Sequence, residues 1–264
     1  MKSSVPDDEI RERWERRAAE QGSNETSVLF KKLPKELNKQ IHKYHSCILN
    51  ERFLPLVVNR SNLLDLGCGF GRISQIINVN RPDISITGLD FSMNFCRLYQ
   101  DSVRRPVVCA DLSKAPFLAQ SFNTIISITS LMYLPASDRA KVMCSLIQLL
   151  KPGGVALFLD PGQEYMDLVA RLHPVSRENS TGGNGFYARD YLSLARSAGV
   201  TVIATGGMLF FSLLLPVMLL LRHSPRSLNM LIGSASWLDR RLNWFGGLSL
   251  HRWMILKVPG QADR

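Results

Sequence analysis

The chain has 264 residues, of which 45% are hydrophobic and 20% are charged, and its 32 Lys and Arg against 22 Asp and Glu give a formal net charge of +10. This composition excludes a disordered chain, and the length suffices for one large α/β domain or two small ones. Five cysteines without a C-x-x-C pair argue against a disulfide framework and a structural zinc site, so we expect no metal. The strongly charged N-terminus is unlike a signal peptide, and we expect a cytoplasmic protein.

Residues 1–60 predict a helical segment in two parts. Residues 8–20 form a charged pattern with Trp14 as its one apolar anchor. From Pro34 to Leu54, apolar residues recur at helical spacing, with a proline at the start, where the first turn of a helix tolerates it.

After Asn62, short apolar runs alternate with helical stretches. The runs that predict strands are Leu63–Leu66, Ile84–Leu89, Val107–Cys109, Thr124–Ile128, Val155–Leu159, Val200–Ala204 and Trp253–Val258. The stretches that predict helices are Arg72–Val79, Ser92–Val103, Ser137–Leu150 and Ala188–Ala198. This alternation indicates an α/β fold with a parallel sheet covered by helices on both faces.

A glycine-rich loop follows the first predicted strand, in the order Asp65-Leu66-Gly67-Cys68-Gly69-Phe70-Gly71-Arg72. Such a loop lets the backbone approach a ligand between a strand end and a helix N-terminus. The dinucleotide pattern G-x-G-x-x-G is not met, because Arg72 occupies its sixth position. The glycines by themselves are also compatible with a tight turn and no ligand.

Two carboxylates follow the next two predicted strands. Asp90 comes 19 residues after Gly71, where a carboxylate can accept hydrogen bonds from ribose hydroxyls, and Asp111 follows the third strand. A carboxylate at Asp111 can accept a hydrogen bond from an adenine amino group. Either residue could instead be a helix N-cap.

Together these segments resemble the class I S-adenosylmethionine-dependent methyltransferases. LLDLGCGFGR, GLDFS, ADLSKAPF and SFNTIISITSLMYL look like the family's first four motifs in order, and LLKPGG looks like the turn before its fifth strand. The resemblance covers roughly residues 60–206. It implies a Rossmann-like, seven-stranded, mostly parallel sheet with helices on both faces. It also implies that residues 1–60 form a lid and that residues 61–264 form the methyltransferase domain, with an apolar helical insertion at about 207–250.

The resemblance further implies S-adenosyl-L-methionine as cofactor and assigns residues to its parts. The loop residues Gly67, Cys68, Gly69 and Gly71 would hold the methionine part. Asp65 would orient this loop or meet the amino group through water, and Ser127 would lie beside the methionine part. Asp90 would hold the ribose, whereas Phe91, Asp111 and Leu112 would surround the adenine.

Methyl transfer from a sulfonium is an in-line displacement in which the protein mainly aligns donor and acceptor. A general base helps when the acceptor is a hydroxyl, and the sequence offers Tyr133 and His173 as candidates. Tyr133 could equally be a pocket wall, and His173 could be a surface or core histidine. The sequence therefore predicts O- or N-methylation without naming the base.

Residues 200–221 contain no charge, and their first part matches the sixth strand. The remainder, Met208–Leu221, is 14 residues long with Pro216 inside, which is short for a membrane span and fits a buried or interfacial helix. Basic residues and Trp follow, and half of the net charge lies in residues 222–264. We expect this segment to be a cap on its own domain, an anionic membrane contact through residues 208–245, or a homodimer face.

The favoured function is methyl transfer to a small or lipid-linked acceptor by a cytoplasmic protein that associates with membranes. An RNA methyltransferase is the first alternative and is supported by the basic charge, although nucleic acid is the less expected partner. A non-catalytic cofactor-binding or membrane-associated protein is the second.

Overall fold

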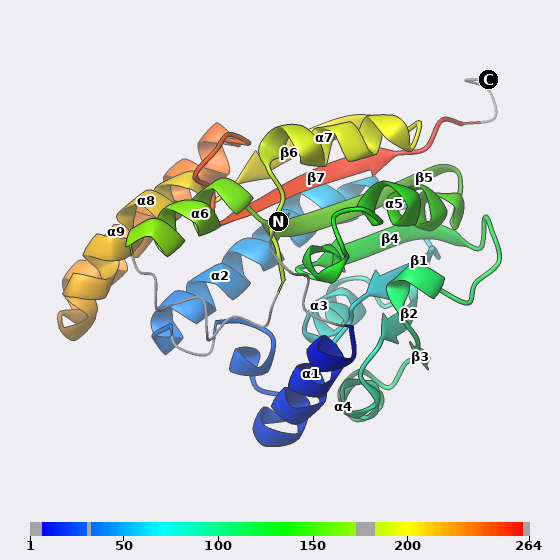
Figure 1. The fold of residues 1–264 in the computed structure, drawn as a ribbon, viewed down its shortest axis with the longest axis horizontal. Helices are drawn as coiled ribbons and strands as arrows, with labels where there is room; N and C mark the ends of the chain where they lie inside the picture. Colours follow the sequence, from blue (N-terminus) through cyan, green and yellow to red (C-terminus); the bar gives the residue numbers. More distant parts are fainter. Residues whose placement is uncertain (1–6, 31–32, 173–182, 261–264) are drawn as a thin grey trace.

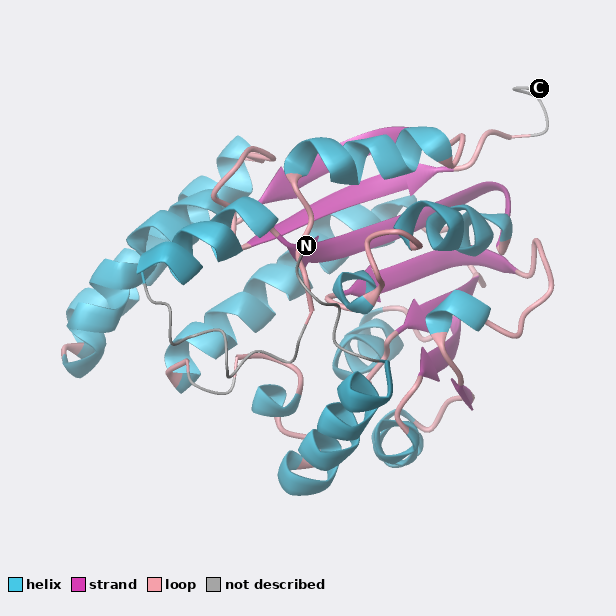
Figure 2. Cartoon of the chain, viewed as in Figure 1, coloured by secondary structure: helices cyan, strands magenta, loops and turns pink. Residues whose placement is uncertain are grey.

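The computed structural model describes residues 7–30, 33–172 and 183–260. Within them a seven-stranded sheet has the order β3-β2-β1-β4-β5-β7-β6 (Figures 1 and 2). The strands are β1 (Asn62–Leu66), β2 (Ser85–Asp90), β3 (Val107–Cys109), β4 (Phe122–Ile128), β5 (Leu150–Pro161), β6 (Thr201–Gly207) and β7 (His251–Lys257). Only β7 runs antiparallel to its neighbours, so the predicted fold class is confirmed.

Helices cover both faces of this sheet (Figure 2). They are α1 (Asp7–Gln21), α2 (Lys35–Cys47), α3 (Arg72–Asn80), α4 (Met93–Val103), α5 (Arg139–Gln148), α6 (Gln163–Leu172), α7 (Ala188–Ser197), α8 (Leu209–Leu220) and α9 (Pro225–Leu242). Because strand side chains alternate between faces, Leu63 enters the core with α2 and α3, and Leu64 enters the core with α5 and α7.

Two predictions about the chain between β4 and α7 were wrong. Lys151–Gly154 was expected to be a turn, but β5 begins at Leu150 and takes these residues into the strand with a register shift against β4. Gly153 keeps a turn-like φ of +76° there. No helix was predicted between the fifth strand and Ala188, yet α6 lies there.

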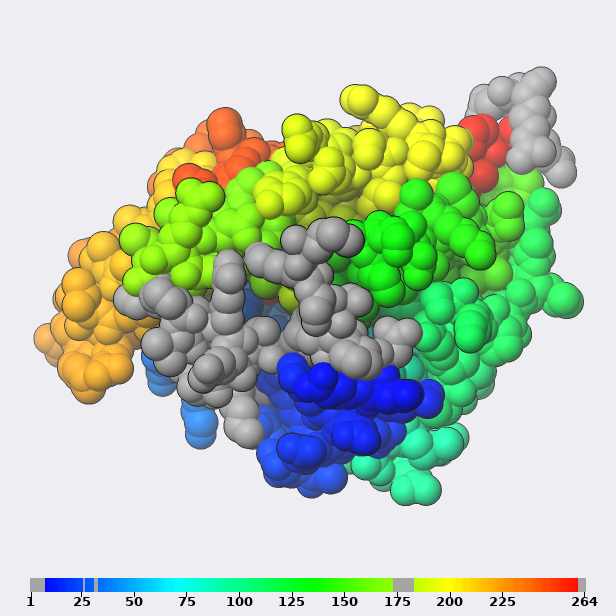
Figure 3. Space-filling model, in the orientation of Figure 1, coloured from blue at the N-terminus to red at the C-terminus, as the bar shows by residue number. Residues whose placement is uncertain are grey.

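The insertion at about 207–250 forms a helical hairpin of α8 and α9 that projects from one end of the molecule (Figures 1 and 3). The buried carboxylate of Asp239 in α9 accepts hydrogen bonds from the backbone N–H groups of Phe210 (2.7 Å) and Phe211 (3.0 Å) at the start of α8. Phe211 and Met218 pack into the main core. No helix among the described residues is long and apolar enough to cross a membrane.

The N-terminal helix α1 is attached to the region where β2 ends. Glu15 accepts hydrogen bonds from the backbone N–H groups of Met93 (2.6 Å) and Asn94 (3.2 Å), which begin α4. Arg11 donates to the carbonyl of Phe91 (3.2 Å). These contacts hold α1 next to the carboxyl end of the sheet, where Trp14 packs against Phe95.

Candidate functional site

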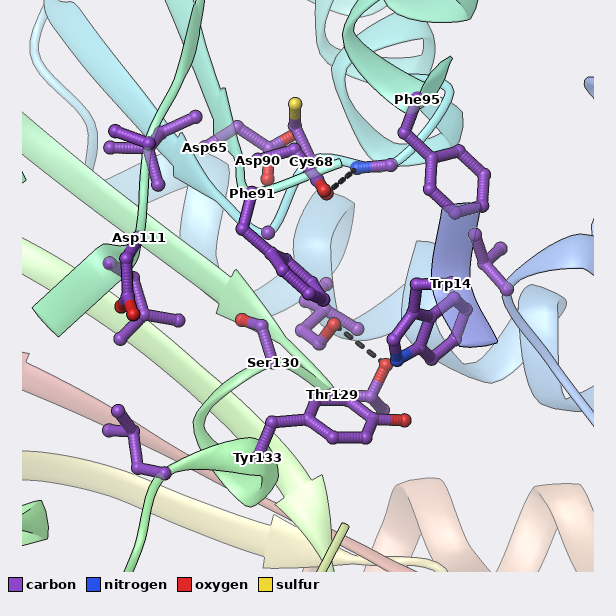
Figure 4. Close-up of a pocket in the computed structure, with 18 of the residues that line it drawn as sticks. Trp14, Asp65, Cys68, Asp90, Phe91, Phe95, Asp111, Thr129, Ser130 and Tyr133 are labelled. Atoms are coloured by element: carbon purple, nitrogen blue, oxygen red, sulfur yellow. Dashed lines mark hydrogen bonds between the residues drawn. The ribbon is translucent and has the colours of Figure 1, made fainter. Parts of the chain in front are cut away.

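A pocket lies at the carboxyl ends of β1, β2 and β4, the edge where open α/β sheets bind ligands (Figure 4). Its walls combine the glycine loop, the strand-end carboxylates and aromatic side chains from α1, α4 and the segment after β4. The lining residues are Ile10, Trp14, Val28, Asp65, Gly67, Cys68, Gly69, Arg72, Ile73, Leu89, Asp90, Phe91, Phe95, Ala110, Asp111, Leu112, Ser113, Ile128, Thr129, Ser130, Tyr133, Leu134, Pro135 and Asp138.

The glycine loop has no room for a side chain at Gly67 or at Gly71. Gly67 has φ +66°, and a Cβ there would lie 2.4 Å from the Cβ of Ser130. Gly71 has φ +88°, and its Cβ would lie 2.1 Å from a methyl group of Val103 in α4. Gly67 therefore lets the loop pack against Ser130 in the pocket wall. Gly71 is not a lining residue and lets α4 pack behind the loop.

Asp90 and Asp65 are buried carboxyl groups beneath this loop. Asp90 accepts hydrogen bonds from the backbone N–H groups of Gly69 (2.8 Å) and Ser92 (2.9 Å). Asp65 accepts one from the hydroxyl of Ser74 (2.6 Å). Burial raises the pKa of each carboxyl to about 6, although these hydrogen bonds favour the ionised form. The two side chains thus shape the loop as well as line the pocket.

Asp111, Leu112 and Phe91 line the pocket at the ends of β2 and β3. Asp111 accepts a hydrogen bond from the backbone N–H of Ser113 (2.7 Å) and caps the short 3₁₀ helix Leu112–Lys114. Asp111 is therefore an N-cap, as the alternative prediction stated, and its second carboxylate oxygen is left to accept a hydrogen bond from a ligand. Figure 4 places Asp111 across the cavity from Trp14, with Phe91 between them.

The segment after β4 supplies the opposite wall. Tyr133 lines the pocket and meets the Trp14 ring edge-on, with ring centroids 5.5 Å apart. Ser127 is fully buried and is not a lining residue; its hydroxyl lies 2.6 Å from that of Ser130, which does line the pocket. Thr129 has φ +59°, a strained conformation for a β-branched residue, next to the cavity. His173 lies outside the described residues.

Trp14 and Arg72 are two of the pocket residues that sequence reasoning missed. Trp14 was expected only as an anchor of its helix, and Arg72 only as the residue that breaks the dinucleotide pattern. Both are 8% exposed and line the pocket. The signal for Trp14 was a lone aromatic residue on a charged helix, and the signal for Arg72 was a cation directly after a glycine loop; neither signal reveals which cavity the side chain meets.

Comparison with known proteins agrees with this geometry. Residues 63–154 match the family model of the methyltransferase domain. The malonyl-[acyl-carrier protein] O-methyltransferase of Bacillus cereus is 28% identical over 178 residues, which cover 64% of each chain. The fatty-acid O-methyltransferase of Mycolicibacterium smegmatis is 25% identical over 137 residues, which cover 50% of this chain and 49% of that protein. The chain thus spans less than two thirds of each of these curated relatives.

A solved structure shows the same fold at low identity. Phosphoethanolamine N-methyltransferase 1 of Haemonchus contortus has a TM-score of 0.62 and 14% identity, and the match covers 100% of this chain and 51% of that one. The ordered motifs, the strand order and the match over residues 63–154 agree on a class I S-adenosylmethionine-dependent methyltransferase domain in this chain. The methyl donor of this family is S-adenosyl-L-methionine. The residues present fit that cofactor, because the glycine loop and the strand-end carboxylates Asp90 and Asp111 line one cavity.

Proposed function

We propose that the protein transfers a methyl group from S-adenosyl-L-methionine to a small, lipid-like acceptor. The observation that carries the proposal is one pocket that brings together the glycine loop, the strand-end carboxylates Asp90 and Asp111, and a cover of aromatic residues. In this proposal the loop holds the methionine part, Asp90 the ribose, and Asp111, Phe91 and Leu112 the adenine.

The cofactor supplies an already activated methyl group when bound. The chain's own residues bind, orient and exclude water. Trp14 and Tyr133 cover the pocket from α1 and from the segment after β4, and both are placed to keep water from the reacting atoms. Tyr133 acts in this proposal as a wall that orients the acceptor.

The lipid-like character of the acceptor is supported from two sides. The relatives reported above are O-methyltransferases named for a fatty acid and for a malonyl-acyl carrier protein. The chain also carries an apolar hairpin next to its domain, with Leu220 81% exposed and Met230 73% exposed. An acceptor with a hydrocarbon chain suits both observations.

Calorimetric titration with S-adenosylmethionine and S-adenosylhomocysteine tests the cofactor site. Wild type should bind both, Asp90→Ala should lose at least about tenfold in affinity, and Asp101→Ala, an exposed carboxylate on α4, should bind like wild type. A folded wild type that binds neither compound would refute the proposal. Turnover with fatty acids from a lipid extract then identifies the acceptor, and cofactor binding without turnover of any acceptor would favour the non-catalytic alternative.

We also propose that α8 and α9 bring the enzyme to an anionic membrane surface. Leu209 to Leu238 contain no acidic residue, and the turn between the helices carries exposed Arg222 and Arg226 beside exposed apolar side chains. Basic and apolar residues together bind anionic interfaces. Figure 3 shows this turn projecting from the end of the molecule.

Co-sedimentation with phosphatidylglycerol and phosphatidylcholine vesicles tests the membrane contact. Wild type should bind only the anionic vesicles. The double variant Arg222→Gln/Arg226→Gln should bind about 30-fold more weakly, because each of the two charges contributes about 1 kcal/mol near the surface. Arg189→Gln on α7, whose side chain is 89% exposed, is the matched control. Equal binding by the double variant and the control would exclude this contact.

A further inference from the structure

Arg72 places a buried positive charge in the wall of the pocket. It is the first residue of α3 and is 8% exposed. Its guanidinium donates to Nδ1 of His42 (2.7 Å) and to Nδ1 of His45 (3.2 Å). Among the described residues, no carboxylate forms an ion pair with it, and Glu25 and Asp65 act on it only from a longer distance.

The imidazoles around Arg72 do not neutralise it. Burial lowers the pKa of His42 and His45, and burial lowers the pKa of His251 to about 3, so all three rings are neutral at pH 7. Since Nδ1 of His45 accepts from Arg72, its Nε2 carries the proton and donates to Nδ1 of His251 (3.0 Å). The chain of rings is therefore fixed in one tautomer around a cation whose hydrogen-bond acceptors are neutral. A buried cation that donates only to neutral acceptors is costly, which points to an anionic ligand.

Two buried donors in the same pocket lack an acceptor. Nε1 of Trp14 and Nε of Arg72 are both buried and have no hydrogen-bond partner in the described part of the chain. Both residues line the cavity. Buried polar groups without partners are rare in folded proteins, and here both unpartnered groups are N–H donors. A ligand that presents acceptor oxygens would satisfy them.

The rest of the lining matches an acid with an apolar chain. Val28, Ile73 and Ile128 belong to both the pocket wall and the main hydrophobic cluster. Four aspartates also line the pocket, and Arg72 is the one cationic side chain among its described lining residues. This cation and the apolar residues together suit an acyl carboxylate. The described lining includes no His, Lys or Glu, and three of its aspartates, Asp65, Asp90 and Asp111, already accept hydrogen bonds from the protein.

We infer that Arg72 and Trp14 form a subsite for the carboxylate of the acceptor, so that the enzyme O-methylates a carboxylic acid. This inference rests on the proposed function. A carboxylate oxygen donates a lone pair to the methyl carbon, and the bond from that carbon to sulfur breaks with its electron pair remaining on sulfur. The products are a neutral methyl ester and a neutral thioether. No proton is released, so the reaction needs no general base.

The test measures binding to the complex with S-adenosylhomocysteine, with decanoate and decanol as probes. Wild type should bind decanoate at least about tenfold more tightly than decanol. Arg72→Met should lose at least about tenfold in decanoate affinity, Arg72→Lys should lose less because it keeps the charge, and Trp14→Phe should lose a few-fold because it removes only the N–H donor. Arg189→Met is the matched control, since that side chain lies exposed on α7.

A second titration separates the acceptor from the cofactor as source of the carboxylate. S-adenosylhomocysteine carries a carboxylate, and 5′-methylthioadenosine lacks it. Arg72→Met should bind each within about twofold of wild type, which also shows that the variant is folded. The inference is overturned if Arg72→Met loses affinity for S-adenosylhomocysteine alone, or if decanoate and decanol bind wild type equally. Failure of wild type to bind S-adenosylhomocysteine would instead refute the proposed function. In that case decanoate is titrated into the protein alone, and binding that is lost in Arg72→Met would still support the carboxylate subsite.

Discussion

The glycine-loop pocket and the α8–α9 hairpin differ in where they place their polar and apolar side chains. In the pocket, the carboxylates of Asp65 and Asp90 are buried and accept hydrogen bonds from Ser74 and from backbone N–H groups. In the hairpin, Leu213, Val217 and Leu220 are 48%, 43% and 81% exposed, one helical turn apart. The pocket thus buries polar groups away from water, whereas the hairpin leaves apolar side chains exposed to water.

This difference teaches that the two regions carry different kinds of specificity. Buried polar groups need partners at fixed positions, so the pocket tolerates little change in shape. An exposed apolar stripe on one helix requires only a surface that removes it from water, so its binding depends on area and charge. Substitutions should therefore have large and local effects in the pocket, and small, graded effects on the exposed face of the hairpin.

The largest expected effect comes from Gly67→Ala. The added Cβ would lie 2.4 Å from the Cβ of Ser130, whose hydroxyl is held by the carbonyl of Leu66 (2.9 Å). We expect a loss of at least about 100-fold in calorimetric affinity for S-adenosylhomocysteine. Gly153→Ala is the control, because it has φ +76° with nothing within 4 Å and should cost only about 1–2 kcal/mol of stability. Equal affinity of Gly67→Ala and Gly153→Ala for S-adenosylhomocysteine would show that the pocket is not sensitive to its shape at Gly67.

Two substitutions in one helix separate the buried face of the hairpin from its exposed face. Met218→Ala removes a fully buried side chain and should lower the free energy of unfolding by about 2–5 kcal/mol. Leu220→Ala should change it by less than about 0.5 kcal/mol, because this side chain is 81% exposed. Leu220→Ala should instead weaken binding to anionic vesicles by several-fold. Urea denaturation and vesicle co-sedimentation measure the two effects, and equal destabilisation by both variants would contradict the assignment of faces.

The buried carboxyl of Asp160, at the end of β5, should make stability depend on pH. It accepts hydrogen bonds from the hydroxyl of Tyr191 (3.0 Å) and the backbone N–H of Met132 (3.2 Å), and burial raises its pKa to about 7. Between about pH 4 and pH 7 the folded state holds a proton that the unfolded state has released, so stability falls as the pH rises.

Comparison of wild type with Asp160→Asn isolates this group, because the other titrating groups are common to both proteins. The stability advantage of wild type should shrink by on the order of 2 kcal/mol between pH 5 and pH 8. Denaturation at both pH values measures it. A difference that does not change with pH would show that the Asp160 carboxyl does not titrate in this range.

The smallest effect is expected for the cap between the two helices of the hairpin. Asp239→Ala removes the acceptor for the N–H groups of Phe210 and Phe211 and should cost about 1–2 kcal/mol of stability. Asp138→Ala is the matched control, because Asp138 precedes α5 without a side-chain capping bond and its loss should cost less than about 0.5 kcal/mol. Thermal unfolding of both variants measures the difference, and an equal cost would show that Asp239 does not hold the hairpin.

The strands, most of the helices and the position of the glycine loop followed from local pattern. Hydrophobic periodicity and the glycines act within a few residues, so they are readable in one dimension. α6 was not predicted, although Tyr165, Leu168 and Val169 recur at helical spacing in its segment. Only the structure shows that Tyr165 packs into the main core. Lys151–Gly154 lie within β5 but between its paired positions Leu150 and Val155, where the register with β4 shifts.

The sequence by itself determined the fold class, the order of the motifs and the candidate residues Asp65, Asp90 and Asp111, because each depends on spacing along the chain. Only the tertiary structure decided that Trp14 and Arg72 meet at the same cavity from positions 58 residues apart. It also decided which face of α8 is buried, since an apolar helix with no polar side has no periodicity to show which side meets the core. Contacts between distant segments depend on the packing of the whole chain, and the local pattern does not encode them.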